Sequence, residues 1–174
     1  RFAMQSQDLE VFEKLVEWLQ QGKSPYLCTI VKAIGSSPRP VGSMLGCCGE
    51  QSIGTLSGGC VEDDLLEKLR TNKIDASVPQ LMEYGVSAEE NERLGLPCGG
   101  RLNILVQQLS PGGADWIIDG TTALRARQSV ARTTDLKTGV TTIRITEDHV
   151  ALRWRGASFS QGLGPQMDRR LGGA

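Results

Sequence analysis

Apolar residues recur at helical spacing near the start of the chain, and shorter β-rich stretches follow them. The helical spacing covers residues 9–19, through Leu9, Phe12, Leu15, Val16 and Leu19. Ser6 or Asp8 can cap the start of this helix, and Gly22 follows its end. Residues 25–34 are apolar and rich in β-branched side chains, which predicts a buried strand.

A second helix is predicted in the first half of the chain, directly after a glycine pair. Prolines and glycines exclude regular structure at residues 35–43, and two short strands are expected after them, at residues 44–47 and 52–56. The glycine pair at residues 58–59 then leads into a helix whose first turn is acidic, as is typical of a helix N-terminus. The apolar face of this helix carries Val61, Leu65 and Leu69.

The second half of the chain alternates short strands with two other segments. Strands are predicted at residues 79–86, 101–109, 128–134, 140–146 and 150–154. Residues 87–94 are polar and predict a loop or a short helix, whereas residues 114–127 predict a helix. Residues 156–174 are rich in Gly, Ser and Gln, a composition typical of a linker.

The pattern as a whole predicts a fold of the α/β or α+β class. We expect one compact domain over residues 6–155, with a mixed sheet and flanking helices. The turns that carry Cys60 and Cys98 are expected at one edge of that sheet. Residues 1–5 are interpreted as an N-terminus with a tag remnant, because they begin upstream of Met4.

Composition and charge narrow the function classes. The chain has 174 residues, of which 39% are hydrophobic and 22% charged, so it can bury an ordinary core. Its formal net charge is −1 and no stretch is strongly basic, which argues against binding to nucleic acid or to an anionic membrane surface. No apolar run is long enough for a membrane span, and no signal-peptide pattern is seen. A cytoplasmic protein is therefore expected.

The five cysteines indicate free thiols in a reducing compartment rather than a disulfide framework. Their number is odd, and their spacing contains no CxxC pair. Cys28 lies in an apolar strand and is assigned to the core, and the adjacent Cys47 and Cys48 are interpreted as packing residues because a disulfide between neighbours is strained. With His149 as the only histidine, a structural zinc site of the Cys/His type is not expected.

Cys60 is the strongest candidate for chemistry. A cysteine that begins a helix feels the positive end of the helix dipole, which favours the thiolate. Gly58 and Gly59 leave room for a ligand, and free amides at a helix start can hold an anionic group. Glu62 and Asp63 in the same turn oppose the thiolate, so the net shift of the thiol is not predicted. On this local chemistry, a working thiol and a small cysteine that only fits a tight turn are equally good interpretations.

Cys98 lies in a second glycine-rich turn. Pro97 stiffens the chain before it, and Gly99 and Gly100 clear the space after it, but no helix follows to activate the thiol. Taken alone, Cys98 is better interpreted as a turn residue. Together with Cys60 it would provide two thiol ligands suited to a soft metal or to sulfur chemistry.

Two arginines are candidates for binding a phosphate or carboxylate group. Arg39 stands between two prolines, and Arg101 follows the glycine pair of the second turn. For either residue alone, a solvated surface arginine is the simpler interpretation.

Three stretches of the chain resemble, in order and spacing, the signature stretches of the XdhC/CoxI family. The first, second and third signature stretches are GSSPRPVG at residues 35–42, SGGCVE at residues 57–62 and GLPCGG at residues 95–100. The resemblance covers residues 26–109, and the second and third stretches are its more specific part. It implies a protein that serves molybdenum hydroxylases such as xanthine dehydrogenase and carbon monoxide dehydrogenase.

By this resemblance, the cargo is molybdenum cofactor, a molybdopterin. Proteins of the family bind it, protect it during sulfuration by a cysteine desulfurase and pass it to the apo-enzyme. Cys60 and Cys98 carry over as cofactor contacts and metal ligands, because molybdenum with its dithiolene is a soft centre that suits thiolates. The residues that shape the two turns are Gly58, Gly59, Gly99 and Gly100. The cofactor's phosphate suits Arg39, Arg101 and backbone amides.

The resemblance also carries expectations about architecture. Members of the family commonly add a C-terminal Rossmann-type domain, which this chain lacks, since no G-x-G-x-x-G pattern occurs. Residues 167–174 resemble the approach to the first strand of such a domain, so residues 156–174 are expected to be a linker toward it. A homodimer is expected from the family alone.

We therefore expect a non-catalytic maturation factor that binds molybdenum cofactor and delivers it to an apo molybdenum hydroxylase. One alternative is a thiol oxidoreductase that cycles a disulfide between Cys60 and Cys98. Another is a structural module that recruits the target enzyme and whose cysteines are inert. The lack of a CxxC pair argues against the first alternative, and the family resemblance argues against the second.

Overall fold

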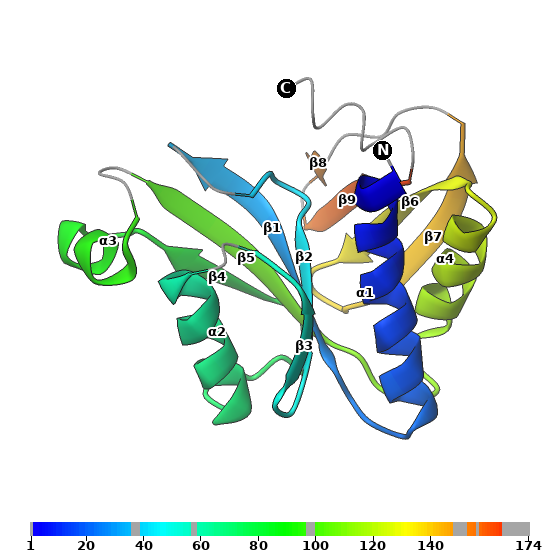
Figure 1. The fold of residues 1–174 in the computed structure, drawn as a ribbon, viewed down its shortest axis with the longest axis horizontal. Coiled ribbons are helices and arrows are strands. Elements are labelled where there is room, and N and C mark those ends of the chain that lie inside the picture. Colours follow the sequence, from blue (N-terminus) through cyan, green and yellow to red (C-terminus); the bar gives the residue numbers. More distant parts are fainter. Residues whose placement is uncertain are drawn as a thin grey trace. The chain divides into compact units, whose positions relative to one another are not determined.

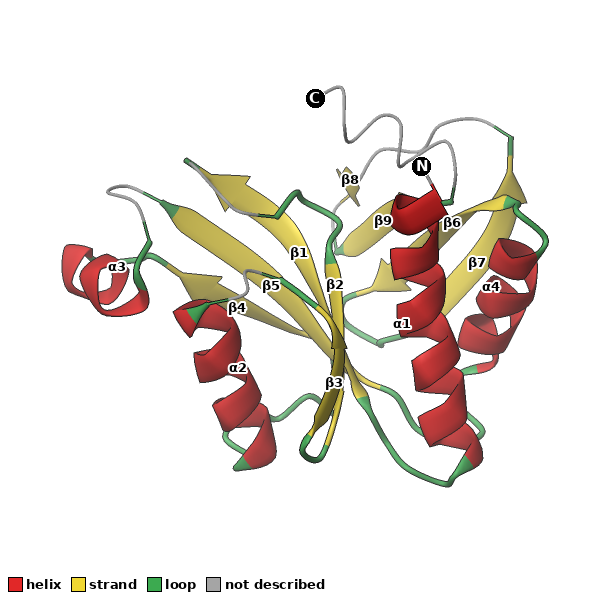
Figure 2. Ribbon diagram, viewed as in Figure 1, coloured by secondary structure: helices red, strands yellow, loops and turns green. Residues whose placement is uncertain are grey.

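The strands of this protein build two separate antiparallel sheets, one of five strands and one of four. The computed structural model describes residues 2–35, 39–56, 59–96, 100–147, 153–155 and 157–164. Across these ranges the chain forms four helices and nine strands (Figures 1 and 2). The fold is therefore of the α/β class, as predicted.

One unit, Tyr26–Gln108, is built on the five-stranded sheet. Its elements are β1 (Tyr26–Ile34), β2 (Met44–Cys48), β3 (Gln51–Gly54), α2 (Cys60–Arg70), β4 (Gln80–Tyr84), α3 (Ala88–Leu94) and β5 (Arg101–Gln108). The strand order is β3-β2-β1-β5-β4, and every neighbouring pair is antiparallel. Each strand predicted in this region is present, and the polar segment before the third signature stretch is the short helix α3.

The packing of α2 against this sheet explains its sequence pattern. The predicted apolar face is buried, and Leu66 is buried with it. These side chains share one core cluster with residues of four strands, among them Cys28, Ile30, Leu45, Cys47, Tyr84, Leu102, Ile104 and Val106. Burial of an aliphatic side chain contributes roughly 1.5–3 kcal/mol, so this cluster is the main stabilising feature of the unit.

The other unit comprises Arg1–Pro25 and Leu109–Ala174 and contains the four-stranded sheet. Its elements are α1 (Phe2–Gln20), α4 (Asp115–Arg125), β6 (Ser129–Asp135), β7 (Thr141–Thr146), β8 (Arg153–Arg155) and β9 (Ser158–Leu163). The strand order is β7-β6-β9-β8. The predicted hairpin between residues 128 and 146 is confirmed as the antiparallel pair β6–β7.

Close packing between α1 and α4 explains why α4 contains Gly120, a residue that is unfavourable within a helix. Phe12 lies edge-on to the Trp116 ring at a centroid distance of 6.0 Å, and Arg125 Nε donates a hydrogen bond to Glu13 Oε2 at 2.8 Å. Glycine in mid-helix costs about 1 kcal/mol relative to alanine. A Cβ at Gly120, however, would lie 2.7 Å from Phe12 Cε2. Glycine at this position therefore allows α4 to approach α1.

A fully buried arginine lies on β6. The guanidinium carbon of Arg132 is 5.7 Å from the Trp116 ring centroid and 5.2 Å from that of Phe159. Burial lowers the pKa of Arg132 to about 10, while the charge of Asp8 acts in the opposite direction. Arg132 therefore remains a cation at neutral pH, next to two aromatic rings.

Two sequence expectations about the ends of elements are wrong. The first helix begins at Phe2, upstream of Ser6 and Asp8, so neither residue is its N-cap. Ser158–Leu163 form β9, which lies between β6 and β8, although residues 156–174 were expected to be a linker. The composition of this segment predicted a linker because it is poor in apolar residues. The strand is stabilised by backbone hydrogen bonds to a neighbouring strand on each side.

One compact domain was expected over residues 6–155. The structure instead divides into the two units described above. Alternating apolar residues predicted the strands correctly, but they do not indicate which sheet a strand joins. The partner of each strand depends on contacts between distant residues, which a local pattern does not contain.

Candidate functional site

The first and third signature stretches meet at one end of the five-stranded sheet. β1 and β5 pair in an antiparallel register that places Ile34 opposite Arg101. Gly35 directly follows β1, and Gly100 directly precedes β5. The register thus brings the start of the first stretch beside the end of the third.

β4 ends at the same place, in close backbone contact with the third stretch. Tyr84, the last residue of β4, pairs with Leu102. Gly85 follows with a φ of 93°, and a Cβ at this position would overlap the carbonyl oxygen of Gly100. Both the positive φ and the close approach require glycine here.

α3 connects β4 to the third stretch, and local sequence specifies both of its ends. Ser87 Oγ accepts a hydrogen bond from the Glu90 amide at 3.1 Å, which caps the helix start. The Glu90 carboxylate accepts hydrogen bonds from the amides of Gly85 and Val86. Gly95 ends the helix in the left-handed conformation with a φ of 71°. The first glycine of the third stretch therefore has a structural role.

The second signature stretch places Cys60 as the first residue of α2, as predicted. Gly59 precedes it in an extended conformation, with φ −142° and ψ −150°, and provides no side-chain cap. Cys60 is exposed, so a ligand can reach its thiol. The Asp63 amide donates to the Gly59 carbonyl at 3.1 Å, which closes the first helical turn. Ser57 and Gly58 lie outside the described residues.

The second predicted thiol has no described position. Pro97, Cys98 and Gly99 lie outside the described residues, and so do residues 36–38 of the first stretch. A meeting of the two thiols therefore stays a prediction. Gly100 is described, and it is buried.

Asp64, one turn after Cys60, ties α2 to β4 and α3. Its carboxylate accepts a hydrogen bond from Tyr84 Oη at 2.9 Å and pairs with Lys68 at 2.9 Å and Arg93 at 3.8 Å. Burial by itself would raise the pKa of this carboxyl group, but its hydrogen-bonded and charged partners bring that pKa below its ordinary value. Burial also raises the pKa of Tyr84, which keeps the phenol protonated as a donor.

All three signature stretches contribute an apolar residue to the same core cluster. Val61 of the second stretch is buried in it, and Val41 of the first and Leu96 of the third are partly buried against it. The stretches are thus fastened to the helix-covered face of one sheet.

The two candidate arginines lie on different elements of this unit. Arg39 is half-buried in the connection from β1 to β2, which is held against β1 by a hydrogen bond of 2.7 Å from the Gly42 amide to the Ile30 carbonyl. Arg101 is the first residue of β5 and is exposed. Their role in binding a phosphate stays a prediction.

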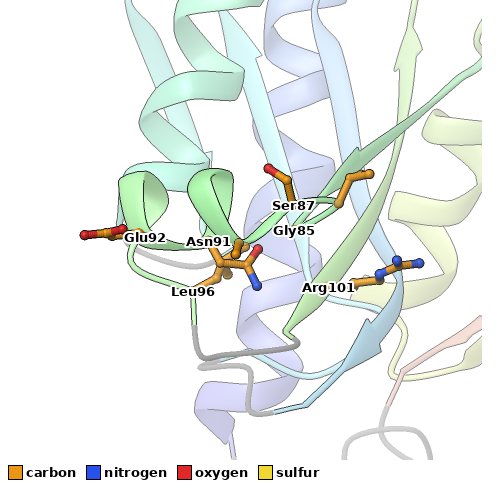
Figure 3. A pocket seen from close by; sticks show the side chains of 8 residues that line it. Gly85, Ser87, Asn91, Glu92, Leu96 and Arg101 are labelled. Atoms are coloured by element: carbon orange, nitrogen blue, oxygen red, sulfur yellow. The ribbon is translucent and has the colours of Figure 1, made fainter.

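A cavity of about 380 Å³ lies between α3 and the start of β5 (Figure 3). Residues that line it include Gly85, Ser87, Asn91, Glu92, Leu96 and Arg101. Leu96 belongs to the third signature stretch and Arg101 directly follows it, so the cavity adjoins that stretch. Its volume is in the range of small-molecule sites.

Two other described cysteines, Cys28 and Cys47, are not suited to chemistry. Cys28 and Cys47 are buried free thiols, and burial raises the pKa of both. A raised pKa keeps the thiol protonated and unreactive at neutral pH. The predicted core position of Cys28 and packing role of Cys47 are confirmed, and Cys48 is half-buried at the end of β2.

Comparison with models of protein families tests the resemblance that the signature stretches indicate. The model of the XdhC and CoxI family matches residues 18–85. Residues 18–85 are thus similar to that family. The resemblance predicted from the sequence is thereby confirmed. The matched residues include the first and second signature stretches, and the third lies beyond them.

A solved structure has the same fold as this chain. It is a crystal structure of a xanthine dehydrogenase from Bacillus halodurans, with a TM-score of 0.65 and 21% sequence identity. The match covers 91% of this chain and 53% of that one, so this chain spans about half the length of that protein. A comparison with curated proteins gives no significant match.

No described helix combines the length and the apolar character that a membrane span requires. The described His, Cys, Asp and Glu residues form no group of three or more that could hold a metal ion. The predicted pair of thiol ligands stays a prediction, because Cys98 is outside the described residues.

Sequence reasoning missed three residues that build this end of the five-stranded sheet. Gly85 and Asn91 stand in no motif, and only the backbone contact and the cavity single them out. Glu90 had a readable signal, because serine followed three residues later by glutamate is the pattern of a capping box. In this structure that glutamate binds the amides just before the cap residue, so it also fixes the Gly85 turn.

Proposed function

We propose that this protein binds molybdenum cofactor and delivers it to a molybdenum hydroxylase such as xanthine dehydrogenase. One observation carries the proposal. Three signature stretches that are distant in sequence are fastened to one core cluster, and two of them meet at one sheet end beside a cavity. The family match and the likeness to the Bacillus halodurans fold support the same assignment.

In this proposal the thiols and the arginines have different tasks. Cys60, exposed at the start of α2, and Cys98 contact the molybdenum-dithiolene end of the cargo, because a soft centre suits thiolates. Arg39 and Arg101 bind the phosphate end, where a guanidinium offers several donors in a fixed plane. The glycines of the two turns, Gly58, Gly59, Gly99 and Gly100, leave space for the cargo to approach the backbone.

Delivery sets a condition on affinity. A carrier that holds the cofactor more tightly than the apo-enzyme does cannot release it, because the cargo distributes according to the two affinities. We therefore propose moderate affinity and no turnover by this protein. A cysteine desulfurase is the expected partner for sulfuration of the bound cofactor, and a homodimer is expected from the family.

Cofactor retention tests the proposal. The purified chain is mixed anaerobically with molybdenum cofactor released from a donor enzyme, and molybdenum and pterin are counted after desalting. We expect near-stoichiometric retention by the wild type and at least a tenfold loss for Cys60→Ala and for Cys98→Ala. Cys48→Ala is the matched control, because Cys48 is a half-buried thiol outside the signature stretches, and it should retain the cofactor fully.

Other outcomes would contradict the proposal in distinct ways. Absence of retention by the wild type would remove the carrier function from this chain. Full retention by the double variant of Cys60 and Cys98 would remove the thiols from the site. If the wild type fails to retain the cofactor and a reductant restores its retention, a disulfide cycle between the two thiols is favoured instead.

A further inference from the structure

The edge strand β7 of the four-stranded sheet carries exposed apolar side chains (Figure 1). It pairs with β6 on one side without a register shift, and the described residues provide no strand on its other side. Ile145 on this strand is 58% exposed, and Val140, directly before the strand, is 62% exposed. Proteins usually protect such an edge with proline, a bulge or lysine, because an open edge is a template for another strand. The strand sequence, TTIRIT, contains neither proline nor lysine.

The hairpin turn indicates which backbone groups of β7 face the open edge. The Asp135 amide donates a hydrogen bond to the Val140 carbonyl at 2.9 Å, so the backbone of Val140 is directed toward β6. Backbone groups alternate in direction along an antiparallel strand. Counted from Val140, the amides and carbonyls of Ile143 and Ile145 are therefore directed away from β6, toward the open edge.

A second copy of this chain fits that edge in a register centred on Ile143. A symmetric dimer uses the same surface of both copies, so the two β7 strands run antiparallel about a two-fold axis. With the axis at Ile143, this residue lies opposite its own counterpart and Ile145 lies opposite the partner's Thr141. Arg144 lies opposite the partner's Thr142, whereas an axis at Arg144 would place two like charges opposite each other.

Charge is also complementary at the ends of the paired strands. In this register Glu147 lies level with the partner's Gly139, the last residue of a turn that also carries Lys137. Glu147 and Lys137 are both exposed. The two-fold axis repeats this approach of opposite charges at the other end of the pair. Such exposed pairs add little affinity, but they favour this register over others.

We propose that β7 pairs with β7 of a second copy of this chain, antiparallel and centred on Ile143, so that the two four-stranded sheets become one continuous sheet. The family resemblance implies a homodimer but no particular surface, and the interface is what this inference adds. It does not rest on the proposed function, because the described parts of the signature stretches lie in the other unit.

Analytical ultracentrifugation of the full chain at micromolar concentrations measures the association. The wild type should form a dimer, and Ile145→Lys should weaken it at least about tenfold, because a charge would be buried at the strand pair. Ile145 is largely exposed in one copy, so the thermal unfolding midpoint should stay within about 2 °C. The matched control is Leu81→Lys on the edge strand β4, where Leu81 is 43% exposed. It should leave the dimer unchanged.

A cross-link tests the register. Directly opposite Cα atoms in a hydrogen-bonded antiparallel pair are about 5.5 Å apart, which a disulfide can span. Mild oxidation of Ile143→Cys should therefore give a covalent dimer, with a peptide joined at position 143 in mass spectrometry. Arg144→Cys is the control, because its two copies would be offset by two residues along the strands and should not cross-link. A cross-link through Arg144→Cys alone would contradict the register.

The remaining outcomes separate the interface from the carrier function. A wild type that stays monomeric would overturn the inference and leave the edge of β7 to a strand of a different protein. A dimer that Ile145→Lys leaves intact would also overturn it, because the copies would then pair elsewhere. If the chain dimerises through β7 but retains no cofactor, the interface stands and the carrier function is wrong. If a monomeric chain retains the cofactor, the carrier function stands and the interface is wrong.

Discussion

The residue that shapes the candidate site most strongly is a glycine without any chemistry of its own. Gly85 has a φ of 93°, a conformation that side chains rarely adopt, and its Cα faces the carbonyl oxygen of Gly100 so closely that a Cβ would overlap it. The turn after β4 therefore sets the distance between β4 and the third signature stretch. It also forms part of the cavity wall.

Replacement of this glycine should be costly. For Gly85→Ala we expect a loss of more than about 2 kcal/mol in the free energy of unfolding, because strain from the positive φ adds to a backbone clash. Gly49→Ala is the control, since Gly49 also has a positive φ, 58°, but a Cβ there meets nothing within 4 Å. It should cost about 1 kcal/mol. Urea unfolding measures both, and equal losses would contradict the role of the contact with Gly100.

Burial separates the cysteines at the same scale. Cys28 and Cys47 belong to the core cluster, where burial raises the pKa of each thiol. Cys60 is exposed at the start of a helix. The packing thiols thus lie in strands of the sheet, whereas the thiol that a ligand can reach lies at a helix start. The alternation of apolar residues already indicated the core position of Cys28.

Three elements meet through a single carboxylate. Asp64 on α2 accepts a hydrogen bond from Tyr84 at the end of β4 and pairs with Arg93 on α3. Cys60 begins the same helix one turn earlier, so this contact orients the second signature stretch relative to the cavity. The pKa of Asp64 lies below its ordinary value, which means that its ionised form is favoured in the folded state.

The pH dependence of stability tests this junction. A carboxyl group with a lowered folded-state pKa stabilises the fold above its ordinary pKa, and the contribution is lost as the pH falls through the folded-state value. Asp64→Asn should lower the free energy of unfolding by about 1 kcal/mol at pH 7. The difference from the wild type should close as the pH falls below about 4. Urea unfolding across this range would show it.

The control for this series is Asp119→Asn, an exposed position on α4. It should match the wild type within about 0.5 kcal/mol at every pH. If the difference in free energy of unfolding between Asp64→Asn and the wild type does not change with pH, the lost stability comes from packing and not from the charge.

For the molecule as a whole, the described parts of the signature stretches, the cavity and the Asp64 junction all fall within Tyr26–Gln108. The other unit has its own buried features, notably Arg132 beside Trp116 and Phe159. The proposed cofactor contacts therefore belong to one unit, and the second unit should affect retention only through stability.

Arg132→Met tests this division of roles. Loss of a buried cation next to two aromatic rings should lower the free energy of unfolding by about 2 kcal/mol. Cofactor retention per folded molecule should equal that of the wild type, whereas Arg101→Gln should reduce it at unchanged stability. Cofactor retention is measured at 4 °C, and stability is measured by thermal unfolding. A loss of retention by folded Arg132→Met would show that the second unit contributes to the site.

The sequence by itself determined the local structure and the resemblance to a family. Apolar periodicity predicted α2 with its buried face, the β6–β7 hairpin and the core position of Cys28, because these features depend on neighbours a few residues away. The signature stretches indicated the XdhC and CoxI family, which the match over residues 18–85 confirmed. Cys60 at a helix start was also predicted, since glycines followed by acidic residues mark such a start.

Only the tertiary structure decided how these parts combine. The register of β1 on β5 joined the first and third stretches, the backbone contact of Gly85 with Gly100 set the cavity wall, and pairing with β6 made β9 a strand where composition predicted a linker. Each outcome depends on residues far apart in the chain. Periodicity reports which face of an element is buried, but the choice of partner is made by packing and hydrogen bonding across the fold.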